Sequence, residues 1–138
     1  MHRSKEGYYV NRHSYFLLRY HLVLVTRYRK PVIKDHIEED LKMYITTYFN
    51  DRGYPVEAME CMPDHVHILF EADPQLEMAK FINALKSASS RYIRTKYHNE
   101  LSRYFWKPYF WSLSYFVCTV SDRSAEVVKK YIDTQKEK

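Results

Sequence analysis

Two histidines stand one residue apart in the apolar run MPDHVHILF, residues 62–70. If this run forms a strand, its side chains alternate across it, so His65 and His67 point to the same face. Their separation along the strand would be roughly 6.5–7 Å, which allows two imidazoles to converge on one cation. Because histidine is the commonest metal ligand among side chains, the pair is a candidate metal site. The same pattern also fits ordinary polar positions on a half-buried strand.

A second pair of chemically capable residues lies near the C-terminus, in the run AEVVKKYIDTQKEK. Tyr131 and Gln135 are four residues apart, so in a helix they share one face. A phenol can act as a nucleophile in covalent catalysis. The chain has 14 tyrosines, however, and one beside Val128 and Ile132 also fits a core position. Gln135 equally fits a solvated position, so periodicity alone assigns neither residue a catalytic role.

The elements that must position both pairs can be predicted from hydrophobic periodicity and turn residues. In chain order we expect a strand at 15–28, a helix at 35–52, strands at 56–61 and 65–71, a helix at 75–97, a strand at 115–120 and a helix at 123–136. Asp35 and Glu38 have the spacing of a capping box at the start of the first helix. Pro74 marks the start of the second helix, and Ser121 or Asp122 is expected to cap the last.

The predicted order is β-α-β-β-α-β followed by one more helix. This order favours an α+β fold of the ferredoxin-like kind, an antiparallel sheet with helices packed across it. The extra C-terminal helix, 123–136, would carry Tyr131 and Gln135. The 138 residues have the usual length of one domain, and we expect residues 1–13 to form a flexible N-terminal tail.

Composition narrows the classes of function. The chain has 22 Lys and Arg against 17 Asp and Glu, a formal charge of +5, which favours a polyanionic partner such as nucleic acid. Gly7 and Gly53 are its only glycines, so a glycine-rich phosphate loop and a nucleotide cofactor are not expected. Cys61 and Cys118 form no CxxC pair and are expected to be reduced thiols. The N-terminus lacks the apolar stretch of a signal peptide and no run is long enough to span a membrane, so we expect a cytoplasmic protein.

Basic residues that could contact DNA form three groups: after the first strand, on the helix 75–97, and within the aromatic segment YFWKPYFWSLSYF, residues 104–116. The candidates are Arg27, Arg29, Lys30, Lys86, Arg91, Arg94 and Lys107. Such residues can follow a phosphate backbone, and aromatic rings can stack on unpaired bases. A solvated helix face, and core or dimer contacts for the aromatic rings, are the alternative interpretations.

Four runs, taken together and in order, resemble one known family. MPDHVHILF, LKSASSRYI, FWSLSYFVCTV and VVKKYIDTQ, with the opening YHLVLVTRYRKPVI, are similar to the TnpA-type, single-tyrosine HUH transposases of single-strand insertion sequences. The resemblance runs from about residue 14 to Gln135. It departs from the family only in the segment SDRSAE, which lacks an expected glycine, and in the N-terminal extension.

The resemblance implies a role for each of the four candidate residues. His65 and His67 match the metal-binding histidines, Tyr131 the nucleophile and Gln135 a third metal ligand. The implied enzyme cleaves and rejoins single-stranded DNA with hairpin ends through a 5′-phosphotyrosine intermediate, with Mg²⁺ or Mn²⁺ as cofactor. It would act as a homodimer, in which a helix could serve the histidines of its own chain or of the partner.

Two alternatives remain at this point. A domesticated relative that acts on repeated extragenic palindromes would share the same chemistry, although a chain ending three residues after Gln135 favours the mobile-element enzyme. A ferredoxin-like nucleic-acid-binding module without catalysis would keep the basic surface and make His65 and His67 incidental. A covalent DNA adduct on Tyr131 would separate the catalytic alternatives from this last one.

Overall fold

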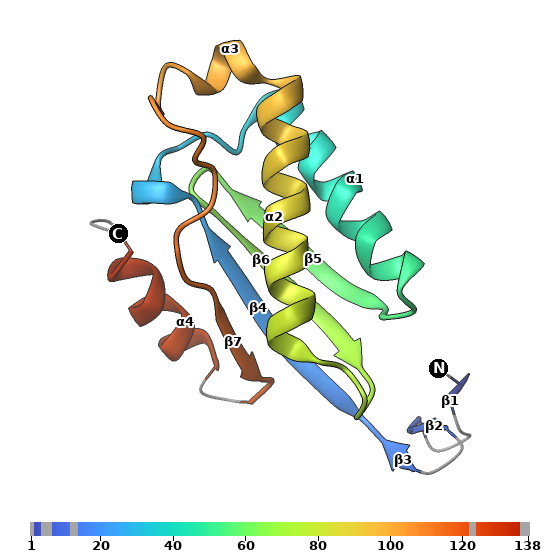
Figure 1. Ribbon diagram of the computed structural model, residues 1–138. Coiled ribbons are helices and arrows are strands. Elements are labelled where there is room, and N and C mark those ends of the chain that lie inside the picture. The colour runs from blue at the N-terminus through green and yellow to red at the C-terminus, as the bar shows by residue number, and fades with distance from the viewer. Residues whose placement is uncertain (1, 4–6, 12–13, 122–123, 136–138) are drawn as a thin grey trace.

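The computed structural model describes residues 2–3, 7–11, 14–121 and 124–135, and its centre is one antiparallel sheet (Figure 1). The four strands are β4 (Leu18–Val25), β5 (Val56–Met62), β6 (His65–Ala72) and β7 (Phe116–Thr119). Their order across the sheet is β5-β6-β4-β7, and every neighbouring pair is antiparallel. This order is that of the split β-α-β arrangement, so the predicted α+β, ferredoxin-like fold is confirmed.

Two long helices cover one face of this sheet. They are α1 (Asp35–Asp51) and α2 (Met78–Lys96), and the short α3 (His98–Leu101) follows α2 directly. Alternate residues of β4 and β6 point toward these helices and are fully buried, as expected for a half-covered antiparallel sheet. The strand contribution to this main core includes Leu22, Leu24, Val66, Ile68 and Phe70.

The other face of the sheet carries a much thinner layer. Helix α4 (Ser124–Asp133) lies over it beside β4 and β7 (Figure 1). Val128 and Ile132 of α4 pack against Val23 and Val25 of β4 in a small cluster separate from the main core. A ten-residue helix is too short to be stable alone in water, so α4 depends on this cluster and on its other contacts with the domain.

The first predicted strand starts at Tyr15 as expected, but it is broken at Leu17 and ends at Val25 instead of residue 28. Residues 15–28 form a short strand β3 (Tyr15–Phe16), then β4, and then a 3-10 turn η1 (Arg27–Arg29). Beyond Val25 the backbone leaves the sheet because other loops take its amides: Thr26 N donates to the Asp64 carbonyl (3.0 Å) and Arg27 N to that of Phe110 (2.8 Å). The basic run after the strand is therefore a tight turn.

The first helix starts at Asp35 as predicted, but the predicted capping box is wrong: Asp35 is the first residue of α1, and the N-cap residue is Lys34, whose side chain makes no capping bond. The predicted start of the second helix is also wrong. Helix α2 begins at Met78, because the Asp73 carboxylate accepts the Gln75 amide (3.1 Å) and holds this stretch in a turn. Asp122, the alternative cap for the last helix, and the final residue of the expected range 123–136 lie outside the described residues.

Part of the expected N-terminal tail is packed against the domain. Strands β1 (His2–Arg3) and β2 (Tyr9–Val10) pair with each other, and β2 pairs with β3. Tyr9 is buried, stacks on Phe16 with ring centroids 5.8 Å apart, and donates its hydroxyl to the Glu71 carboxylate. Within the described ranges, no helix has the length and apolar character needed to cross a membrane.

Candidate functional site

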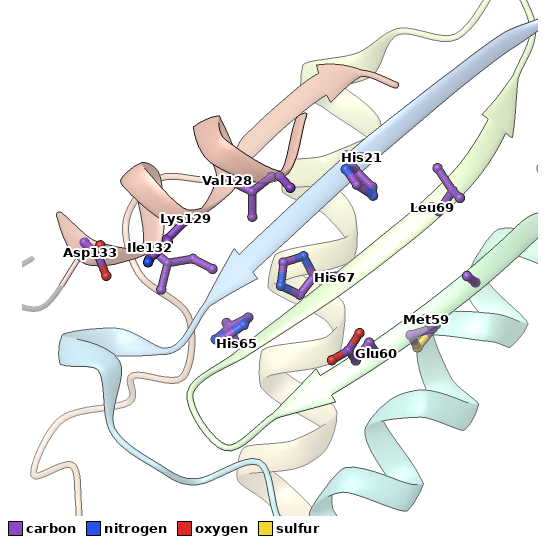
Figure 2. Close-up of a pocket in the computed structure, with 12 residues that line it drawn as sticks. His21, Met59, Glu60, His65, His67, Leu69, Val128, Lys129, Ile132 and Asp133 are labelled. Carbon is purple, nitrogen blue, oxygen red and sulfur yellow. The ribbon is translucent and has the colours of Figure 1, made fainter. Parts of the chain in front are cut away.

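A cavity of about 700 Å³ lies between the sheet and α4 and contains both histidines (Figure 2). From the sheet it is lined by His21, Ala58, Met59, Glu60, His65, His67 and Leu69, and from α4 by Ala125, Val128, Lys129, Ile132 and Asp133. The sheet supplies nearly all of its metal-ligating groups. We call this cavity the histidine pocket.

His65 and His67 lie on the same face of β6, as the alternation of the strand predicts. They are paired across the sheet with Val25 and Val23 of β4, the two residues that hold α4. Their ring centroids are 4.8 Å apart at an interplanar angle of 76°. The imidazoles are therefore close enough to share one ion.

His65 is oriented by a carboxylate that sequence reasoning treated only as a turn residue. Asp64 Oδ1 lies 2.7 Å from His65 Nδ1, and Asp64 Oδ2 accepts a hydrogen bond from Arg29 Nε at 3.0 Å. Burial raises the pKa of Asp64, but the hydrogen bonds from His65 and Arg29 outweigh it, so the pKa is lowered and the side chain is a carboxylate. Because the carboxylate is bonded to Nδ1, the Nε2 atom of His65 is left to bind a ligand. Metal-bound histidines commonly have a carboxylate partner of this kind on their other ring nitrogen. The adjacency of Asp64 to His65 was the available signal.

Arg29 was predicted to contact DNA, and its placement is different. Besides Asp64, its guanidinium lies 3.9 Å from the Asp133 carboxylate of α4. Arg29 thus bridges the turn beside the histidine pocket to the last helix. Its positive charge faces two carboxylates instead of an open phosphate-binding surface.

His67 is partly buried, and this burial favours its neutral form. Its pKa is lowered, mainly by burial and then by the neighbouring His65 and His21, while Glu60 acts in the opposite direction. A neutral imidazole is the form that binds metal. His21, which sequence reasoning did not single out, has its ring 6.4 Å from that of His67. Its buried Nδ1 has no hydrogen-bond partner in the part of the chain that the structure describes.

The Tyr131 phenol faces β7 and the segment before it. Its hydroxyl is 2.8 Å from Ser114 Oγ, and its ring lies 5.3 Å from that of Phe116. Burial raises the pKa of Tyr131, with the Ser114 hydrogen bond acting against the rise. The phenol is therefore held in its protonated form in this position.

The predicted helix 123–136 is too long: α4 ends at Asp133, and Gln135 lies in the turn that follows it. Gln135 still shares the partner Ser114 with Tyr131. It is 1% exposed, and its Oε1 accepts hydrogen bonds from Ser112 Oγ (2.8 Å) and Ser114 Oγ (3.3 Å). Neither residue lines the histidine pocket, to which α4 presents its other faces. The single chain therefore brings His65 and His67 together and brings Tyr131 and Gln135 together, but does not join the two pairs.

The histidine pair fits a divalent metal ion. Two imidazoles share one face, one of them has a carboxylate partner, and the pocket has room for water and substrate oxygens. Among the described residues, no three His, Cys, Asp or Glu side chains are grouped to hold a metal. A third protein ligand would therefore be of another type, and the Gln135 amide oxygen has suitable chemistry for a hard cation.

Five of the other predicted DNA-binding residues are found in three settings. Arg94 and Lys107 line a second cavity next to α3, while Arg91 and Lys30 are exposed. Lys86 is half-buried and donates to the Ser114 carbonyl (3.1 Å); burial, and then the charge of Arg27, lower its pKa. Lys86 is thus a packed cation beside the Tyr131 segment, unlike the open stripe expected on this helix.

Comparison with known proteins agrees with the sequence resemblance. The family model described as "Transposase IS200 like" matches residues 14–135. The chain is 36% identical to the ISDra2 transposase TnpA of Deinococcus radiodurans over 123 residues, 89% of this chain and 87% of the relative. It is 25% identical to the transposase for insertion sequence element IS200 of Salmonella typhimurium, over 91% of this chain and 81% of the relative.

Solved structures share the same fold. A crystal structure of a protein from Deinococcus radiodurans R1, described as a transposase, is 33% identical and superposes with a TM-score of 0.85, over 92% of this chain and 97% of the other. A REP-associated tyrosine transposase, solved bound to a REP hairpin, matches at 12% identity with a TM-score of 0.55, over 91% of this chain and 68% of the other. Because the family model and the ISDra2 relative each cover most of the sequence, the chain belongs to the IS200-like transposase family.

Proposed function

We propose that this transposase cleaves and rejoins single-stranded DNA at the ends of an insertion sequence, through a 5′-phosphotyrosine on Tyr131. The observation that carries the proposal is that the helix bearing Tyr131 packs over the sheet face bearing His65 and His67. A metal-ligating pair and a candidate nucleophile thus share one layer of the fold. The family resemblance supplies the expected DNA substrate with hairpin ends.

In the proposed cleavage step, the Tyr131 oxygen attacks a phosphorus atom of the strand. The new O–P bond forms as the bond from phosphorus to the 3′ oxygen breaks; the phenol gives up its proton and the departing oxygen takes one up as a 3′-hydroxyl. The phosphodiester energy stays in the tyrosine–DNA bond, so another 3′-hydroxyl can reverse the step and join a different strand. This needs no nucleotide cofactor, in keeping with a chain of two glycines.

We assign His65 and His67 to a divalent ion, Mg²⁺ or Mn²⁺, with Gln135 as the third protein ligand. When bound, such an ion would offset the charge that develops on the phosphate oxygens during transfer. Imidazole ligands shift the preference toward Mn²⁺, and the lack of thiolate or additional carboxylate ligands argues against Zn²⁺. Asp64 would hold His65 in the required orientation, and the buried, neutral His67 would need no deprotonation.

The two residue pairs must meet for this reaction, and a homodimer offers one way. Each chain has one Tyr131, whereas moving an element requires cutting and exchanging two ends. Either α4 turns on its own sheet, or the α4 of a second copy brings Tyr131 and Gln135 to the histidine pocket. The hydrogen bonds of Tyr131 to Ser114 and of Gln135 to Ser112 would have to break in the first case.

The covalent intermediate can be tested directly. Incubation with single-stranded hairpin DNA and Mn²⁺ should give a protein–DNA adduct that survives denaturing electrophoresis. Tyr131→Phe should abolish the adduct and leave hairpin binding unchanged, while Tyr92→Phe, a control on α2, should behave as wild type. An adduct of normal yield from Tyr131→Phe, or none from the wild type despite tight binding, would refute the proposal; the second result would favour a non-catalytic module.

Mixing two inactive variants tests the assembly. A chain with His65→Ala and His67→Ala keeps Tyr131, and a Tyr131→Phe chain keeps the histidines. If the site is built from two chains, a mixed dimer regains one intact site and forms adduct. If each chain builds its own site, the mixture stays inactive, and α4 must move within the chain.

A further inference from the structure

We propose that a groove at the α3 end of the molecule binds an unpaired nucleotide of the DNA strand, with Trp106 as the stacking surface. This inference rests on the proposed function, because it names a second contact for the same single-stranded substrate. The groove has a volume of about 770 Å³, and its lining includes Arg94, Trp106, Lys107 and Tyr109. We call it the tryptophan groove.

Trp106 is unusual among the aromatic residues of its segment. Its side chain is 86% exposed, whereas Phe105, Phe110 and Trp111 are 1–6% exposed and belong to the main core. Lys107 Nζ lies 4.7 Å from the centre of the Trp106 ring. An unpaired base can stack on the exposed indole of Trp106, and the neighbouring Lys107 can pair with the phosphate of the same nucleotide.

The charges around the tryptophan groove favour an anionic occupant. Arg94 and Lys107 contribute cations, and no carboxylate is among the lining residues. Two other cavities on this side of the molecule differ: one is lined by Asp35 and Glu100, and the other by Asp40 and Asp51. Of the three, the tryptophan groove is therefore the one whose charges suit a nucleotide.

A series of contacts runs from the tryptophan groove to Asp64, the residue before His65. The Arg27 guanidinium lies 4.0 Å from the ring centre of Tyr109, which lines the groove, and its buried Nε has no hydrogen-bond partner within the described ranges. The preceding residue, Thr26, donates its amide to the Asp64 carbonyl next to His65. Figure 1 shows α3, η1 and the start of β6 at the same end of the sheet. The tryptophan groove and the first residues of β6 therefore lie at the same end of the molecule, so a DNA strand bound at one could extend toward the other.

The test uses the full-length protein and a single-stranded oligonucleotide that extends beyond the hairpin. The chain has two tryptophans, so quenching of the exposed Trp106 can be separated from the signal of the buried Trp111 by comparison with Trp106→Phe. We expect the extended strand to quench Trp106 and Trp106→Ala to raise its Kd by about 5- to 150-fold, the range for loss of one stacked base. Lys107→Ala should lower the slope of log K against log salt by about 0.7, as for one lost phosphate contact on a single strand.

The control is Tyr15→Ala, which removes an aromatic ring that is 77% exposed on β3, and it should change the Kd by less than twofold. Unchanged quenching and Kd in the Trp106 variants would overturn the proposal. So would equal effects of Trp106→Ala on a duplex of the same length, because the contact would then not require an unpaired base. Normal adduct yield without a Trp106 effect would refute only the groove, whereas Trp106 quenching without any adduct would refute only the proposed cleavage.

Discussion

Replacing Asp64 with alanine should weaken binding of Mn²⁺ to the histidine pocket by about 10- to 100-fold, the usual cost of removing a carboxylate partner from a metal-bound histidine. This corresponds to about 1.4–2.7 kcal/mol. The geometry supports a full effect: Asp64 Oδ1 is 2.7 Å from His65 Nδ1, and the side chains of Asp64 and His65 are only 20% and 12% exposed. Water can therefore replace the carboxylate only in part, and Arg29 also loses its partner on this side.

Calorimetric titration of the DNA-free protein with Mn²⁺ measures this loss without depending on catalysis. Asp64→Asn should lie between alanine and the wild type, because an amide oxygen can still accept the Nδ1 proton but carries no charge. Asp40→Ala is a matched control, since this carboxylate also has a basic partner, Lys96 at 2.6 Å, but belongs to a cavity on the helix-covered side. Wild-type affinity in Asp64→Ala, or an equal loss in Asp40→Ala, would refute the role of Asp64.

Three further predictions concern α4, its phenol and one thiol. Ile132→Ala removes one of the two buried α4 side chains from the small cluster with β4. The substitution should destabilise the docked helix by about 2 kcal/mol, so amide hydrogen exchange in α4 should accelerate about 30-fold while the main core stays protected. Equal acceleration throughout the domain would contradict this prediction. Ser114→Ala removes the hydrogen bond that lowers the pKa of Tyr131, so ultraviolet titration against Tyr131→Phe should show ionisation at higher pH. Burial raises the pKa of Cys61 to about 11, so at pH 8 its alkylation should be roughly a hundredfold or more slower than that of a free cysteine peptide, with Cys61→Ala assigning the signal.

The elements and their order along the chain could be predicted because the information is local. Alternation in β5 and β6, the break between them, and the two helical periodicities each depend on neighbouring residues. The errors fall where distant residues decide the outcome. The predicted strand 15–28 ends early because Thr26 bonds to the Asp64 carbonyl and Arg27 to that of Phe110, both far away in sequence. The secondary-structure propensities of residues 26–28 contain no information about these long-range bonds.

The candidate site divides in the same way. The spacing of His65 and His67 predicts that both lie on one face of β6, and the contact between their rings agrees with this. The spacing of Tyr131 and Gln135 predicts that these two residues lie on one side, and both bond to Ser114. The rotation of α4 about its own axis could not be predicted. It follows from which residues of the sheet meet Val128 and Ile132, and this depends on the pairing of β4 with β6 and β7.

That rotation has an energetic consequence for the proposed reaction. Turning Tyr131 toward the histidine pocket within one chain would move Val128 and Ile132 off Val23 and Val25. Burial of each such side chain contributes roughly 1.5–3 kcal/mol, and the hydrogen bonds of Gln135 add to the cost. Spontaneous rotation is therefore rare, and DNA binding or a second chain must supply the difference. If mixed inactive variants form adduct, the second chain supplies the difference, and Tyr131 acts at the histidine pocket of its partner.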